Sequence, residues 1–254
     1  KPNFRMIIIL CFPVTKEKPM KQKIGSIAAA DDEIQPLIAQ MQIEKTEEAA
    51  MLKLIEGTWQ GQSITAVRCG VGKVNAALAT QLLVDKQVSA VIMIGTAGAL
   101  DPNIEIGDVI IIERCTYHDV DHSGVLIHYH PYMKDLWFLS DPDLVHLAER
   151  AAGQGNGEGK IRTGRGVSGD QFIDQAGRSS IIEKFNPDCV DMESAAVAHV
   201  CYVNQIPFLA LRAISDTPHQ SGSKAYHQNS SWAALQALTL LERMMSELGE
   251  NRPE

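Results

Sequence analysis

The sequence has few cysteines, no block of positive charge and no long apolar run. Its five cysteines form no C-x-x-C pair, and their odd number argues against a disulfide framework. We interpret them as small apolar core residues in a reducing compartment, which predicts a cytoplasmic protein. A net charge of −8 without a basic block excludes nucleic acid as an expected partner. No run reaches the roughly 18 apolar residues of a membrane span, so no membrane partner is expected.

The first residues differ from the rest of the chain. Residues 6–14 form a short apolar run behind Lys1 and Arg5, as at the start of a secretory signal, but no small-x-small cleavage site follows. We interpret residues 1–19 as an N-terminal extension outside the fold and residues 20–254 as one domain. A retained strand or a targeting segment is the alternative, and it leaves an exported form open.

The remaining chain alternates short apolar runs with segments of helical periodicity. With 45% apolar and 21% charged residues, one large α/β domain accounts for the 254 residues. About seven strands with interspersed helices predict a single-domain three-layer α/β/α sandwich with a mixed, twisted sheet. The predicted strands are residues 23–29, 63–69, 89–95, 107–113, 160–167, 189–193 and 207–216. The predicted helices are residues 34–44, 74–86, 141–152, 174–185, 194–201 and 230–249, and residues 51–62 are expected to form a hairpin around Glu56-Gly57.

Carboxylates stand where predicted strands end. Asp216 ends the apolar strand 207–216, and ligands of open α/β sheets bind beyond the carboxyl ends of strands. Its alternative role is to cap the next element. The acidic run 31–33 complements a helix dipole, or one member faces the ligand as a base. Asp191 and Glu193 lie among apolar residues, and buried carboxylates need partners or ligands.

Three further segments allow more than one interpretation. Gly70-Val-Gly-Lys73 precedes a helix and is a weak candidate for anion binding, because it lacks the full P-loop pattern. Histidines and aspartates alternate in residues 118–122, which fits a metal site or simply a polar loop. The aromatic residues of the loop 124–138 indicate a lid or a subunit contact. We expect no metal and no organic cofactor.

Several of these motifs occur together in one order and spacing, over about residues 20–250. The set resembles the bacterial 5′-methylthioadenosine/S-adenosylhomocysteine nucleosidases, which have the nucleoside phosphorylase fold. It comprises Lys23-Ile-Gly with Asp31-Asp-Glu33, Gly70-Val-Gly-Lys-Val74, Ile94-Gly-Thr-Ala-Gly98, Gly107-Asp-Val with Tyr117-His-Asp119, Val167-Ser-Gly-Asp-Gln-Phe-Ile173, Val190-Asp-Met-Glu193 and Arg212-Ala-Ile-Ser-Asp216.

The resemblance implies that residues 20–254 form a nucleosidase domain with a small nucleoside as substrate. Such enzymes hydrolyse the N-glycosidic bond of 5′-methylthioadenosine and S-adenosylhomocysteine, releasing adenine and the thioribose, in methionine salvage and methyl-cycle recycling. 5′-Deoxyadenosine is a further candidate substrate. The resemblance also implies a homodimer in which a neighbour's loop closes the pocket, and the aromatic loop is our candidate for that contact.

The resemblance assigns roles to eight residues. Asp216 would protonate N7 of the purine, and Glu33 would activate the attacking water, as paired acids can on a sugar. The substrate-binding residues would be Thr96 near the ribose and water, Phe172 stacked on adenine, Ile173 reading the adenine edge through its backbone, Met192 packed on the sugar, Glu193 holding the ribose hydroxyls, and Ser215.

The sequence departs from the family pattern at a few positions. Asp191 stands where the family usually has Glu, Ala30 where a Met often lines the pocket, and Ala28 and Ala99 where glycines are common. The loop 122–138 also differs, so the end of the pocket that takes the 5′-substituent could be altered.

The sequence is also compatible with other functions of the same fold. A purine or uridine phosphorylase needs arginines around phosphate, and the candidates are Arg68, Arg114 and Arg212. The acidic run 31–33 is a poor neighbour for that anion and favours water as the nucleophile. A hydrolase of another nucleoside, such as futalosine, and a nucleoside-binding domain without chemistry are the remaining alternatives.

Overall fold

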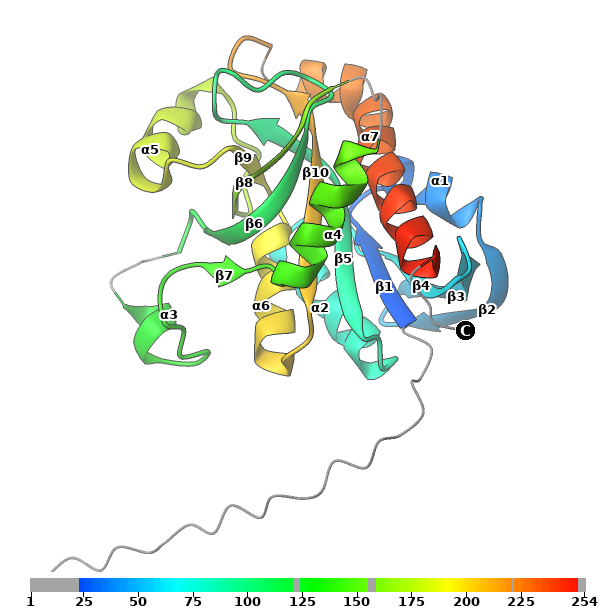
Figure 1. Cartoon of the computed structure of the whole chain (residues 1–254). Helices are drawn as coiled ribbons and strands as arrows, with labels where there is room; N and C mark the ends of the chain where they lie inside the picture. Colours follow the sequence, from blue (N-terminus) through cyan, green and yellow to red (C-terminus); the bar gives the residue numbers. More distant parts are fainter. Residues whose placement is uncertain (1–22, 121–123, 155–158, 221, 251–254) are drawn as a thin grey trace, which may run out of the picture.

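The computed structural model describes residues 23–120, 124–154, 159–220 and 222–250. The predicted extension 1–19 lies outside the described residues. In the described part, one mixed sheet of ten strands is covered by helices on both faces (Figure 1). The predicted three-layer sandwich is therefore confirmed. Among the described residues, no helix combines the length and the apolar character needed to cross a membrane.

The strands are β1 (Lys23–Ala28), β2 (Gln42–Ala49), β3 (Leu52–Trp59), β4 (Gln62–Arg68), β5 (Ala90–Ala99), β6 (Val109–Tyr117), β7 (Phe138–Leu139), β8 (Ile161–Ser168), β9 (Cys189–Asp191) and β10 (Phe208–Asp216). The helices are α1 (Asp31–Ile38), α2 (Lys73–Asp85), α3 (Val125–His128), α4 (Pro142–Gly153), α5 (Gln175–Phe185), α6 (Ser194–Asn204) and α7 (Ser223–Glu250).

The order of the strands brings distant segments of the chain together. The sheet runs β10-β6-β8-β9-β5-β1-β4-β3-β2, and β10 also pairs with β5. The strands β5, β10, β6, β8 and β9 therefore form a closed circuit of pairings. Since β4, β1, β5 and β10 are mutually parallel, their carboxyl ends meet at one edge of the sheet. The acidic run after β1, the tip of β5 and the end of β10 share that edge.

Two apolar cores hold the helices against the sheet. On one face, Ile34 of α1, Leu147 of α4 and Leu241 of α7 pack on β1, β5 and β10. On the other face, Leu83 of α2 and Val197 of α6 pack on alternate residues of the same strands. This burial on both faces explains why β5 and β10 are continuous apolar runs in the sequence.

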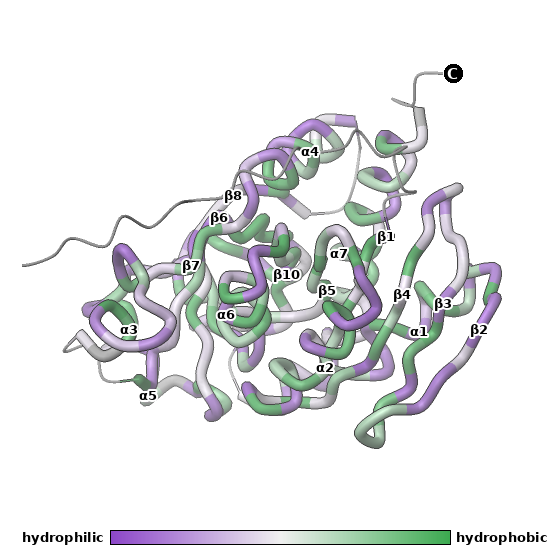
Figure 2. Tube along the Cα trace, turned by 90° about the horizontal axis from the view of Figure 1, so that it is seen from below, coloured by the Kyte–Doolittle hydropathy of each residue, from purple (hydrophilic) through white to green (hydrophobic). Residues whose placement is uncertain are grey.

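The predicted boundaries were wrong at one end of the sheet. The helix predicted for 34–44 ends at Ile38, and β2 begins at Gln42. The predicted hairpin around Gly57 is instead the middle of β3, and the chain turns at Ala50-Met51 and at Gln60-Gly61. Figure 2 shows β2 as a largely hydrophilic strand at the end of the sheet. An edge strand exposed on both faces carries no apolar alternation, so the pattern gave no strand signal there.

The other differences concern the number of strands, the starts of two helices and the short helix α3. That helix lies in the segment 124–138, which was predicted as a loop, and α1 begins at Asp31 and not at residue 34. Ten strands are present in the described residues rather than about seven, because β2, β3 and the two-residue β7 add to those predicted. The last helix begins at Ser223, earlier than the predicted residue 230.

Candidate active site

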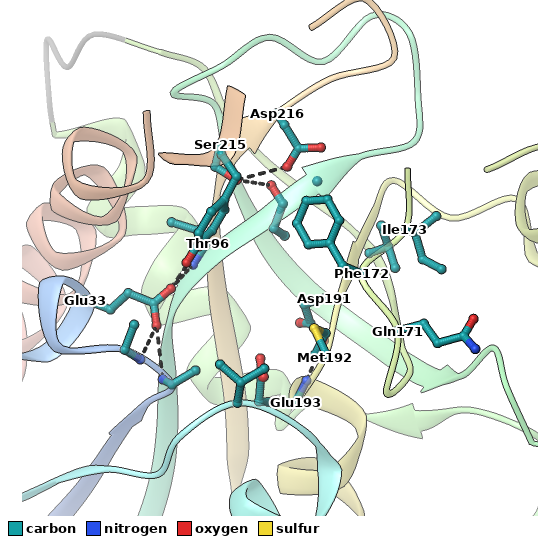
Figure 3. Close-up of a pocket in the computed structure, with 17 residues that line it drawn as sticks. Glu33, Thr96, Gln171, Phe172, Ile173, Asp191, Met192, Glu193, Ser215 and Asp216 are labelled. Atoms are coloured by element: carbon teal, nitrogen blue, oxygen red, sulfur yellow. Dashed lines mark hydrogen bonds between the residues drawn. The ribbon is translucent and has the colours of Figure 1, made fainter. Parts of the chain in front are cut away.

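A cavity of about 190 Å³ opens at the carboxyl edge of the sheet. All eight residues predicted for the site line it: Glu33, Thr96, Phe172, Ile173, Met192, Glu193, Ser215 and Asp216. In Figure 3, Asp216 and Glu33 lie on different sides of this cavity, with Met192 and Glu193 below and Phe172 and Ile173 on the facing loop. The structure thus brings the predicted residues together, and their chemical roles stay predictions.

Glu33 is held by four hydrogen bonds at the start of α1. Its Oε2 accepts from the backbone N–H groups of Ala29 and Ala30, each at 3.0 Å. Its Oε1 accepts from the backbone N–H of Thr96 at 2.8 Å and from the Thr96 hydroxyl at 2.9 Å. A carboxylate has only acceptor oxygens, so this set of donors suits the ionised group.

The other two carboxylates of the acidic run point elsewhere. Asp31 pairs with Arg68 at 2.6 Å on the surface, and Asp32 accepts hydrogen bonds from Ser230 and Ser231 of α7. Of the three acids that were candidates for a base, Glu33 is the one that lines the cavity.

Two glycines at the tip of β5 make room for the acids. Gly95 has a φ of +150°, and a Cβ there would come within 2.7 Å of Glu33 Oε1 and 2.5 Å of an Arg212 nitrogen. A Cβ on Gly98 would lie 3.0 Å from Asp216 Oδ2. The motif Ile94-Gly-Thr-Ala-Gly98 therefore allows both carboxylates to approach the same strand closely.

Asp216 ends β10 and is only 2% exposed. Its Oδ2 accepts a hydrogen bond of 2.6 Å from Arg178 Nη2, and its Oδ1 accepts one of 3.1 Å from the Ser215 hydroxyl. Burial raises the pKa of Asp216, and the positive charge of Arg178 opposes that rise. Because α7 begins only at Ser223, Asp216 does not cap the next helix.

Glu193 lies across the cavity and is buried as well. Its Oε1 accepts from the backbone N–H of Gly72 at 2.9 Å, and its Oε2 accepts from Arg212 Nη2 at 3.3 Å. Burial raises the pKa of Glu193 to about 7, although Arg212 opposes the shift.

Asp191 supports the residues beneath Glu193. It accepts hydrogen bonds from Arg212 Nε at 2.8 Å and from the backbone N–H groups of Glu193 and Ser194, each at 3.1 Å. The hydroxyl of Ser194 donates to it as well. Asp191 and Glu193 thus share one cationic partner, Arg212, as expected for buried carboxylates. The shorter acid at this position organises this wall of the cavity, which it also lines.

The glycine-rich segment before α2 binds carboxylates of the protein itself. The backbone N–H of Gly72 donates to Glu193, and that of Lys73 donates to Asp170 at 2.9 Å. The N-terminus of α2 attracts negative charge, as its sequence indicated, but side chains of this chain occupy the two donors.

The aromatic side of the cavity includes a residue that the sequence reasoning missed. Phe172 is 47% exposed and meets Tyr226 of α7 edge to face, with ring centroids 6.1 Å apart. Tyr226 also lines the cavity, and burial raises the pKa of its hydroxyl to about 12. Arg178 was missed too, because one arginine in a helix carries no sequence signal of its own.

The segment proposed for a metal is only partly described. Asp121 and His122 lie outside the described residues. Asp119 accepts two hydrogen bonds of 2.8 Å from Lys73, and burial lowers the pKa of His118. Within the ranges that the structure describes, no group of three His, Cys, Asp or Glu side chains could hold a metal ion.

Comparison with known proteins agrees with this geometry. A family model described as the phosphorylase superfamily matches residues 23–247, so the chain belongs to that superfamily. The 5′-methylthioadenosine/S-adenosylhomocysteine nucleosidase of Staphylococcus carnosus is 35% identical over 232 residues, covering 89% of this chain and 100% of that protein. Within the superfamily, the chain belongs to the family of these nucleosidases, and the resemblance seen in its motifs is confirmed.

Solved structures of the same architecture support this placement. A 5′-methylthioadenosine/S-adenosylhomocysteine nucleosidase from Colwellia psychrerythraea in complex with adenine matches with a TM-score of 0.82 and 28% identity, over 90% of this chain and 96% of that one. The futalosine hydrolase of Helicobacter pylori matches with a TM-score of 0.80 and 25% identity, over 89% of this chain and 98% of that one.

Proposed function

We propose that this protein hydrolyses the N-glycosidic bond of 5′-methylthioadenosine and S-adenosylhomocysteine, releasing adenine and the thioribose. The observation that carries the proposal is that Glu33 and Asp216, from two distant segments, line one cavity together with Phe172 and Glu193. The match to the S. carnosus nucleosidase over 89% of this chain supports this choice of substrates.

The two acids suit opposite ends of the bond that breaks. Asp216, whose pKa is raised by burial, can donate a proton to the purine so that adenine leaves as a neutral molecule. Glu33 can accept a proton from the attacking water once the Thr96 hydroxyl, one of its four donors, turns away. Hydrogen bonds from Ala29, Ala30 and the Thr96 backbone keep Glu33 in place while it does so.

The other lining residues fit the parts of a nucleoside. Phe172 offers a flat, half-exposed ring on which a purine can stack, and the backbone of Ile173 lies next to it. Glu193 presents buried carboxylate oxygens to the ribose hydroxyls, and Met192 lies beside it to contact the sugar. Thr96 and Ser215 add two side chains with hydroxyl groups to the lining of the cavity.

The arginines favour water over phosphate as the nucleophile. Each of the three candidates for a phosphate site has a carboxylate of its own: Arg68 pairs with Asp31, Arg114 with Glu113, and Arg212 with Asp191 and Glu193. In the described part of the chain, none of the three lines the cavity. A phosphorylase site needs arginine donors that converge on the anion.

The test is product analysis with purified protein. Incubation with 5′-methylthioadenosine should release adenine at the same rate with and without phosphate. Strict phosphate dependence would show a phosphorylase instead. A parallel set with S-adenosylhomocysteine, 5′-deoxyadenosine and futalosine decides the substrate, and turnover of futalosine alone would contradict the proposal. Binding of adenine without turnover of any nucleoside would indicate a binding domain.

We further propose a homodimer that pairs through an exposed apolar surface beside the pocket. Val74 of α2 and Tyr202 of α6 are 78% and 43% exposed, and α2 and α6 pack on each other. The Tyr202 hydroxyl donates to the carbonyl of Tyr132 in the aromatic loop, and Val71 at the same end of α2 lines the cavity. Exposed apolar patches of this kind mark subunit contacts. A mass of one chain in light scattering would contradict this arrangement.

A cytoplasmic location is also a proposal. It is supported by the four cysteines in the described part of the chain, which are buried free thiols. Fractionation of cells that produce the full chain is the test.

A further inference from the structure

We infer that Arg178 is a positioning residue that restrains the Asp216 carboxylate through their ion pair and releases it when the purine enters. This inference rests on the proposed function, in which Asp216 is the acid. It assigns to α5 a part in the reaction cycle that its sequence does not indicate.

The contact itself is short and buried. Arg178 Nη2 lies 2.6 Å from Asp216 Oδ2, and the two side chains are 4% and 3% exposed. Arg178 Nη1 donates to the carbonyl of Ala99, at the tip of β5. These two hydrogen bonds draw Asp216 against the end of β5, where Gly98 leaves it room.

The ion pair between Arg178 and Asp216 works against the proton donation proposed for Asp216. A general acid must carry a proton before it can give one away. A guanidinium bonded to a carboxylate stabilises the ionised form and lowers the pKa of the acid by about 1–3 units. Both oxygens of Asp216 also accept hydrogen bonds already, from Arg178 and from the Ser215 hydroxyl. Burial raises the pKa of Asp216 and Arg178 opposes that rise, so Asp216 becomes a more effective acid when the Arg178 bond opens.

The position of Arg178 connects this bond to the purine site. The loop that carries Phe172 and Ile173 leads directly into α5, which starts at Gln175, so Arg178 lies in the first turn of the helix. Phe172 lines the cavity and is half-exposed. A purine that stacks on Phe172 shifts this loop, and the shift reaches Arg178 through a single turn of helix. Apart from Asp216, Arg178 bonds the carbonyl of Ala99, and its buried Nε has no hydrogen-bond partner among the described residues.

Other ionisable groups near Asp216 act on it less directly. Tyr226 of α7, Glu33 of α1, Asp191 at the end of β9 and Glu193 at the start of α6 line the same cavity. Arg178 is the charged side chain that both bonds Asp216 and lowers its pKa. Removal of the Arg178 charge should therefore shift the pKa of Asp216 more than the pKa of the other groups that line the cavity.

The first experiment is a pH profile of kcat/KM for 5′-methylthioadenosine in wild type, Arg178→Gln and Arg162→Gln. At alkaline pH, kcat/KM is limited by the fraction of free enzyme in which Asp216 is protonated. We expect Arg178→Gln to extend the alkaline limb by about one pH unit, a tenfold relative gain there. Arg162 pairs with Asp108 at 3.2 Å outside the cavity lining, so its variant should follow wild type. Coincident alkaline limbs in all three proteins would overturn the inference.

The second experiment uses the wild-type protein and does not depend on a variant that folds. In a crystal structure with adenine, Asp216 should bond the purine, and Arg178 Nη2 should lie beyond hydrogen-bond distance from Oδ2. An intact ion pair beside a seated adenine would show that no release occurs.

Different results would exclude the role of Asp216 and the role of Arg178. An Asp216→Asn variant with near-normal turnover, or a wild type that releases no adenine, would remove the proposed function. An inactive Asp216→Asn variant with an unchanged Arg178→Gln profile would remove only the role of Arg178.

Discussion

Arg212 Nε donates a hydrogen bond of 2.8 Å to Asp191 Oδ2 in a place almost closed to solvent, where the two side chains are 1% and 3% exposed. The same guanidinium reaches Glu193 at 3.3 Å. One arginine of β10 therefore neutralises two acids that come from β9 and from the start of α6. Although burial opposes its charge, Asp191 and Glu193 raise the pKa of Arg212. The wall that presents Glu193 to the cavity depends on this arginine.

Replacement of Arg212 by Met should destabilise the protein strongly. The change leaves two buried carboxylates without their cation, and breaking a buried pair in this way costs about 3–5 kcal/mol. Urea unfolding measures the loss. In an Asp191→Asn/Glu193→Gln background the same replacement should cost much less, because little charge is left unpaired. Equal costs in both backgrounds would contradict the coupling.

Asp216→Asn should abolish turnover and retain binding. Asparagine keeps the size of the side chain but has no acidic proton to donate, and general acid catalysis contributes about 10²- to 10⁴-fold. Steady-state kinetics and adenine binding by calorimetry separate the two effects. Asp143→Asn, on the exposed side of α4, is the matched control and should behave as wild type. Near-normal turnover in Asp216→Asn would remove the proposed acid.

The candidate site could be predicted where its residues end strands. Glu33, Thr96 and Asp216 follow or finish the apolar runs of β1, β5 and β10, so their meeting at one edge follows from parallel strands. Glu193 follows β9, which runs antiparallel to β5, so the parallel arrangement alone does not explain its place at the cavity. Arg178 and Tyr226 could not be found in this way. They come from helices, and which helical side chain turns toward the cavity depends on how α5 and α7 pack, which the local pattern does not record.

The errors in the predicted strand boundaries have the same cause, because they also occur where tertiary contacts and not local pattern decide the structure. Buried strands such as β5 and β10 have a strong apolar signal because helices cover both of their faces. β2 is stabilised by its pairing with β3, along the register from Gln42 to Ala49, rather than by burial. Whether residues 42–49 form a strand therefore depends on the pairing with β3 and cannot be predicted from their own pattern. Gly57 looked like a turn residue, but it is needed because the backbone of β2 crosses close to it.

Glu33→Gln should lose both turnover and some stability. A glutamine has one acceptor oxygen and one NH2 group, so it cannot accept from Ala29 and Ala30 on one side and from Thr96 on the other. A buried donor without a partner costs about 1–3 kcal/mol, and loss of a general base costs about 10²- to 10⁴-fold in kcat. Thermal unfolding measures the loss of stability, and steady-state kinetics measures the loss of kcat.

The adjacent acid supplies the control for this variant. Asp32→Asn removes a charge from the same helical turn but outside the cavity lining, and it should leave kcat close to wild type. Comparable losses in both variants would mean that the charge of the helix start matters rather than the position of Glu33.

The stability of the protein should depend on pH through Glu193. Burial raises the pKa of Glu193 from 4.5 to about 7 in the folded protein. The folded state then holds the proton on Glu193 more tightly than the unfolded chain does. The stabilisation that results is fully present below about pH 4.5 and is lost as the pH rises through about 7. Compared with Glu193→Gln, which does not titrate, wild type should lose about 3 kcal/mol of unfolding free energy over this range. Urea unfolding at several pH values measures the difference, and Glu183→Gln on the exposed side of α5 should run parallel to wild type. If wild type and Glu193→Gln also run parallel, Glu193 titrates alike in the folded and unfolded chains, and its burial has no effect on its charge.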